Sequence, residues 1–265
     1  ESVGSRSRAL ILSDDDAVIA DYKVKITDDL ASIDQGYATL DANVMDPQIR
    51  SQLTEFVSAL APYEAEILKV EDLGTLNTDT QALTITTTEG SAALAKVEET
   101  MGALASALAA RVSAGDLSAF PAYKSTSEAF MTLTDVFRQQ RNVLLASSLP
   151  AKQEEWNADY KAGVENLASL FPSLQRTVPA TERALLEAAQ AAYEGMVVAM
   201  DKAVDVSMQR GDYNALQAAT SAADLRRTVS GVLNAMVVRN GELLIAADVE
   251  AKQLYDNSMM LLISL

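Results

Sequence analysis

Apolar and polar positions alternate along the chain as they do in helices packed into a bundle. Apolar residues recur at alternating steps of three and four over most of the length, and the strict alternation typical of strands is nowhere sustained. The stripes predict helices across residues 18–44, 53–70, 91–112, 120–144, 156–174 and 179–203, with further helix from 211 to the C-terminus.

Turn and capping signals separate these helices. Asp46-Pro47 predicts a helix start, with the Asp as cap and the Pro in the first turn, and Ser13 followed by Asp14–Asp16 predicts another. Gly115-Asp116, Leu149-Pro150 and Gly211-Asp212 predict breaks, the last of which is either a kink or a reversal. Residues 71–90, rich in Thr and Gly, predict a long helix that is either continuous or broken.

The chain also resembles itself. Ala20-Asp21-Tyr22-Lys23 recurs as Ala158-Asp159-Tyr160-Lys161, and Leu30-Ala31-Ser32 recurs as Leu167-Ala168-Ser169. Because such pairs fall in the same order along consecutive helices, they predict a duplication roughly over 13–112 and 150–210.

Composition then removes most enzyme classes. The chain of 265 residues has no Cys and no His, which excludes thiolate or imidazole metal sites, a Cys nucleophile and a Ser-His-Asp triad. A net charge of −16 with no basic run argues against nucleic acid as a partner. We therefore expect no cofactor, no metal and no catalytic residue.

The order of helices carries a resemblance. The predicted order begins with a helix over Arg6 to Leu12, the acidic turn Asp14–Asp16, a long helix and a Pro-started long helix. A second set of helices follows and is entered through Phe137–Arg141. This order resembles the helical bimodular sensor domain of bacterial chemoreceptors. The resemblance covers nearly the whole chain and implies an all-α fold of stacked four-helix bundle modules. Two modules, or three as in a rhizobial relative of this domain, both fit the chain length.

The same resemblance implies a function. Residues 1–258 would be the periplasmic sensor domain of an inner-membrane protein, the methyl-accepting chemotaxis protein, flanked by membrane helices and acting as a homodimer without enzymatic activity. It would bind a small ligand, often an organic acid, and transmit a conformational signal across the membrane. A histidine-kinase sensor shares this architecture, and a helical spacer or assembly module that binds no ligand is the contrasting alternative.

Arg141 is the first candidate for ligand binding. It lies on the stripe that contains Phe137 and Leu144, with Thr134 two turns earlier, so the pattern predicts a guanidinium that faces the bundle core. Such a group needs a carboxylate, either from a ligand, with Arg138 as a second donor, or from an acidic residue of the chain. An Arg that reaches the rim is the third interpretation.

Two further predictions concern the ends of the chain. Arg6, on the first helix, matches the position where the resembled family often carries an anion-binding Arg. The apolar residues of 259–265 predict either the start of a transmembrane helix or a helix end that docks on its own bundle.

Overall fold

The computed structural model describes residues 2–263, and it describes the side chains of residues 2–260. Every long element among these residues is a helix, and no strand occurs among them, so the predicted all-α fold of helical bundle modules is confirmed. The chain divides into two compact units: unit 1 contains residues 1–75 and 214–265, and unit 2 contains residues 76–213. The predicted duplication over 13–112 and 150–210 stays a prediction.

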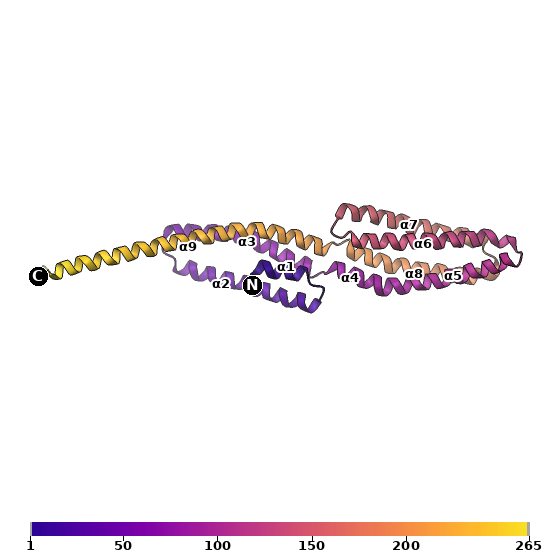
Figure 1. The fold of residues 1–265 in the computed structure, drawn as a ribbon, viewed down its shortest axis with the longest axis horizontal. Coiled ribbons are helices and arrows are strands. Elements are labelled where there is room, and N and C mark those ends of the chain that lie inside the picture. Colours follow the sequence, from indigo (N-terminus) through magenta and orange to yellow (C-terminus); the bar gives the residue numbers. More distant parts are fainter. Residues whose placement is uncertain (1, 264–265) are drawn as a thin grey trace. The chain divides into compact units, whose positions relative to one another are not determined.

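Unit 1 consists of the short helix α1 (Val3–Ile11), the long helices α2 (Asp16–Asn43) and α3 (Pro47–Gly74), and α9 (Gly211–Ile263) from its fourth residue on (Figure 1). The predicted caps are present, because Asp15 accepts hydrogen bonds from the amides of Ala17 and Val18, and Asp46 accepts from Gln48 and Ile49. Both long helices therefore begin where the sequence indicates.

The core of unit 1 joins all four of its helices. Its buried apolar side chains come from α1, α2, α3 and α9, and they include Leu10, Ile26, Ile67 and Val229. The described side chains of α9 from residue 244 to residue 260 are exposed. The predicted membrane segment, 259–265, lies partly outside the described residues.

Unit 2 is a four-helix bundle. Its first helical segment is α4 (Thr78–Ile85), a π turn η1 (Thr86–Gly90) and α5 (Ser91–Ser113); the others are α6 (Phe120–Leu145), α7 (Pro150–Thr177) and α8 (Arg183–Ser207). Figure 1 shows α5, α6, α7 and α8 side by side, and one continuous apolar core joins them. The 3-10 turns η2 (Leu117–Ala119) and η3 (Ala180–Glu182) precede α6 and α8.

Positive φ angles mark three of the breaks between helices. Gly115 has φ 92°, as the predicted helix stop requires, and Asp116 then caps the next turn. Asn77 (φ 46°) and Arg210 (φ 54°) lie where the chain passes between the units. The break near Gly211-Asp212 is therefore real, and a further break at Asn77 interrupts the segment for which the sequence left continuity open.

One helical stretch could cross a membrane by length and composition. Ala180–Met260 contains an 18-residue window with a mean hydropathy of 1.2, of which 11% is buried. The core helix of a water-soluble bundle can pass the same test, so this stretch is weak evidence for a membrane segment.

Candidate functional site: a groove beside a π turn

The core face of α6 is not the one that the aromatic residues predict. Its buried residues are small or aliphatic, and Phe120 and Phe130 are 50% and 37% exposed. The residues of the buried face are Ala122, Thr126, Ala129, Leu133, Val136, Gln140 and Val143. Because Ala122 and Ala129 allow neighbouring helices to approach closely, the bulkier aromatic rings lie beside this face rather than on it.

Arg141 therefore does not point into the core. Its side chain is exposed, and it lines a groove on unit 2 of about 330 Å³. Among the described residues, no ion pair of Arg141 is found, although the chain has 37 Asp and Glu residues. The prediction that the Arg141 guanidinium faces the core is wrong. The intramolecular ion pair considered for it is not formed in the described part of the chain.

Two kinds of side chain line the groove with Arg141. The hydroxyl-bearing ones come from the π turn and the start of α5, and the apolar ones come from α4 and α6. The hydroxyl-bearing residues are Thr86, Thr87 and Ser91, and the apolar residues are Leu83 of the same helical segment and Phe137, Leu144 and Leu145 of α6. The groove thus combines one cation, hydroxyl groups and an apolar wall, a combination typical of sites for small organic ligands.

Hydroxyl groups bond to backbone carbonyls throughout the π turn. Thr87 donates to Leu83 O at 2.9 Å, Thr88 donates to Thr84 O at 2.6 Å and Ser91 donates to Thr86 O at 3.0 Å. A π turn is wider than an α turn by one residue and disturbs the regular ladder of backbone hydrogen bonds. The threonine-rich sequence therefore stabilises the wide turn through its side chains.

Gln140 connects this turn to α6. Its fully buried side chain donates from Nε2 to the Thr86 hydroxyl at 2.9 Å. Its Oε1 is buried and has no hydrogen-bond partner among the described residues. Gln140 precedes Arg141 directly, so two consecutive residues of α6 contact Thr86 and line the groove, respectively.

The other predicted ligand residues do not join this groove. Arg138 is exposed and pairs with Asp135 at 3.0 Å, one turn earlier on α6, and the exposed Thr134 hydroxyl donates to Phe130 O at 3.5 Å. Arg6 belongs to unit 1, where it pairs with Asp29 at 2.8 Å and donates to Lys25 O. Only Arg141 of the four lines the groove.

A second polar cluster ties the first and last residues of unit 2 together. The Asp212 carboxylate accepts from the Asp79 amide at 3.0 Å, and the Thr78 hydroxyl accepts from the Gly211 amide at 3.0 Å. Each helix N-terminus, of α4 and of α9, is thus capped by a side chain from the other. Burial and the neighbouring Asp212 raise the pKa of Asp79, against the hydrogen bond that Ser147 donates to it.

Arg210 and Gln153 extend this cluster. Arg210 donates to Gln153 Oε1 at 2.6 Å and to Glu154 at 2.5 Å, while the buried Gln153 donates to the Ser207 hydroxyl at 3.0 Å. The left-handed Arg210 is held by these bonds at the end of α8.

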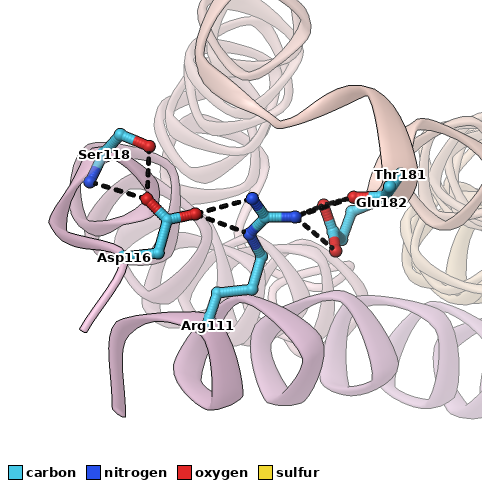
Figure 2. Close-up of polar contacts among 5 residues, drawn as sticks. All are labelled: Arg111, Asp116, Ser118, Thr181 and Glu182. Atoms are coloured by element: carbon cyan, nitrogen blue, oxygen red, sulfur yellow. Dashed lines mark hydrogen bonds and ion pairs between the residues drawn. The ribbon is translucent and has the colours of Figure 1, made fainter. Parts of the chain in front are cut away.

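A third cluster joins the turns that precede α6 and α8. Figure 2 shows Arg111 between two acidic residues, bonded to Asp116 at 2.6 Å, to the Thr181 hydroxyl at 2.8 Å and to Glu182 at 3.4 Å. Hydrogen bonds from Ser118 and Arg111 lower the pKa of Asp116. The guanidinium is saturated by the chain's own groups, so this cluster is an internal clamp.

The buried tyrosines of unit 2 are structural anchors. Tyr160 donates to Asp201 at 2.8 Å, and Tyr193 donates to Val164 O at 2.7 Å. Burial, together with Asp201, raises the pKa of Tyr160, and burial raises the pKa of Tyr193 to about 12. Both phenols are therefore held neutral, and each hydroxyl donates its proton to a partner within the bundle.

Part of the chain is similar to a known family of sensory modules. Residues 2–112 match the family described as a four helix bundle sensory module for signal transduction. The resemblance to bacterial sensory domains is thereby confirmed over these residues, which include α1 to α4 and most of α5. No curated protein and no solved structure matches the chain.

Proposed function

We propose that the chain is the extracytoplasmic sensor domain of a chemoreceptor that binds a small carboxylate and has no enzymatic activity. The match of residues 2–112 to a sensory module for signal transduction carries this proposal. A periplasmic location, flanking membrane helices and a homodimer belong to the same proposal, as they do to the resembled receptors. A histidine-kinase sensor is the alternative, because it differs in the output domain and not in the architecture of the sensor.

Charge favours a carboxylate as the ligand. In a chain of net charge −16, a guanidinium for which no ion pair is found among residues 2–260 lines a groove that also offers hydroxyl groups. An Arg binds a carboxylate through two parallel hydrogen bonds, and the apolar wall would accept the carbon skeleton of a small acid. The groove volume of about 330 Å³ lies at the lower end of the usual range for ligand pockets, which suits a small molecule.

The test is a thermal-shift screen with acetate, succinate, malate and citrate, and with sugars and amines for comparison. A ligand that binds only the folded state stabilises it by about 2.7 kcal/mol at a hundredfold excess over its dissociation constant. We expect one of the acids to raise the melting temperature and Arg141→Ala to abolish that rise while the domain stays folded.

Arg138→Ala is the matched control, because Arg138 is an exposed Arg of the same helix that does not line the groove. We expect this variant to keep the shift. The absence of a shift with every acid, or an equal shift in Arg141→Ala, would reject the carboxylate proposal.

A further inference from the structure

The π turn of unit 2 coincides with an irregular spacing of core positions. In the first helical segment these positions are four residues apart at Thr78, Ala82, Thr86, Gly90 and Leu94. The spacing then alternates between three and four, through Val97, Met101, Leu104 and Leu108. Four steps of four residues are about 1.6 residues longer than four α-helical turns. The wide turn at Thr86–Gly90 accommodates one of these extra residues.

The fold does not need this extra residue. Without the exposed Thr88, the same core side chains would follow one another at steps of four, four, three, four and three, which is the spacing of a regular α-helix. The π turn also contains three consecutive threonines, Thr86–Thr88, which are poor helix formers. The insertion therefore costs helical regularity without improving the burial of either α4 or α5.

What the insertion does provide is a wall of the groove. Thr86 and Thr87 of the π turn and Ser91, directly after it, line the groove opposite Phe137 and Arg141. The Thr86 hydroxyl accepts from Gln140, so its own proton is directed away from Gln140. Among the described residues no acceptor for that proton is found, and the groove is the space that Thr86 borders.

We propose that the π turn is the specificity-determining wall of the carboxylate site, retained for binding rather than for folding. Arg141 binds one carboxylate of the ligand, and the Thr86 hydroxyl, fixed by Gln140, donates a hydrogen bond to the same ligand. The wide turn sets the distance between these two donors and thereby selects the acid that fits. This inference rests on the proposed function, namely that the groove beside Arg141 binds a small carboxylate.

The first test deletes Thr88. The expected result is a helical protein that melts at or above the temperature of the wild type, since the deletion converts the π turn into an α turn and keeps both core faces. Isothermal titration with acetate, succinate, malate and citrate in turn should show at least tenfold weaker binding of the acid that the wild type prefers.

The second test keeps the chain length. Thr86→Val removes the hydroxyl of a residue that lines the groove, and Thr88→Val removes a hydroxyl of the same turn from a residue that does not line it. We expect Thr86→Val to weaken binding of the preferred acid at least tenfold and Thr88→Val to leave it within twofold. Circular dichroism on both variants confirms that they are folded.

The outcomes separate this inference from the proposed function. If the wild type binds an acid and Arg141→Ala does not, but both the deletion and Thr86→Val bind normally, the π-turn inference is wrong and the proposed site stands. The stability measurement does not depend on a ligand: a deletion variant that melts below the wild type overturns the inference even if no acid binds. One that melts at or above the wild type supports the part of the inference that the turn is not retained for folding. A wild type that binds none of the acids overturns the binding part together with the proposed function.

Discussion

Glu71 is an acidic residue whose charge is poorly compensated inside unit 1. It is 4% exposed, and its Oε1 has no hydrogen-bond partner among the described residues. Burial raises the pKa of Glu71, and Lys23 only partly opposes this. The folded protein thus binds the proton of the Glu71 carboxyl more tightly than the unfolded chain does. The stability gained from this protonation is fully present below the pKa of the unfolded chain, and it is lost as the pH rises through the raised pKa of the folded protein.

We expect Glu71→Gln to raise the melting temperature at pH 7, because it removes the cost of burying a carboxylate. A gain of 1 kcal/mol corresponds to about 2–4 °C in a chain of this size. The gain should shrink as the pH falls through the raised pKa of the folded protein and should be gone below about 4.5, where the wild-type carboxyl is protonated in both states. Melting curves from pH 3.5 to pH 8 measure this dependence.

Glu55→Gln is the control for this prediction, since Glu55 is an exposed residue of the same helix. It should leave the melting temperature almost unchanged over the whole pH range. A Glu71→Gln variant that melts below the wild type at pH 7 would mean that the carboxylate has a compensating partner and would refute the prediction.

The sequence made Arg141 a candidate for ligand binding on an incorrect premise. An apolar stripe through Phe137 and Leu144 suggested a charge inside the core, whereas α6 turns Val136, Gln140 and Val143 inward. The prediction placed the large aromatic residues of α6 on its buried face and gave the alanines less weight. In unit 2, however, the small side chains lie on the buried face, where they allow the helices to pack closely. Nothing in the sequence near Arg138 or Thr134 shows that they lie outside the groove, because that depends on the rotation of α6 about its axis.

At the scale of helices, the capping residues were predicted from the sequence and the π turn was missed. Asp46-Pro47 and Gly115-Asp116 are local signals, and the structure places a helix end at each. The reciprocal caps of α4 and α9 join residues more than 130 positions apart, which no local pattern reveals. The successive steps of four from Thr78 to Leu94 are visible in the sequence, and they are the signal from which the wide turn could have been found.

The reciprocal caps lead to a prediction for α9. Thr78→Val keeps the shape of the side chain and leaves the Gly211 amide without its acceptor, so we expect a loss of about 0.5–2 kcal/mol in stability. Hydrogen exchange measured by mass spectrometry should become faster in the peptide that covers residues 208–214. Thr78→Ser, which keeps the hydroxyl, should resemble the wild type, and unchanged exchange in Thr78→Val would contradict the proposed cap.

The two units differ in how the chain builds them. Unit 2 is one continuous segment, 76–213, whereas unit 1 needs both 1–75 and 214–265. Unit 2 also contains its own apolar core, the groove and two polar clusters, one around Thr78 and Arg210 and one around Arg111. The segment 76–213 therefore has what an independently folding bundle requires.

We expect any association of the whole chain to use exposed apolar side chains of α9, a helix that belongs to unit 1 from its fourth residue on. Val237, Val238, Leu244 and Ile245 of α9 are each more than 60% exposed. A net charge of −16 opposes the approach of a second copy, and this repulsion is screened over about 3 Å in 1 M salt, against about 10 Å in 0.1 M salt. A homodimer formed through α9 should therefore strengthen as salt is added.

Sedimentation equilibrium can test this with matched proteins. We expect the mass of the 265-residue chain to rise from monomer toward dimer with protein concentration in 1 M salt, and the segment 76–213 to stay monomeric. Ile245→Asp should weaken the association without unfolding the protein, because the side chain that it replaces is 69% exposed. A chain that remains monomeric at high concentration and high salt, with the preferred acid present, would reject the dimer. Association of the isolated segment 76–213 would instead place the contact on unit 2, because α9 beyond its first three residues is absent from that protein.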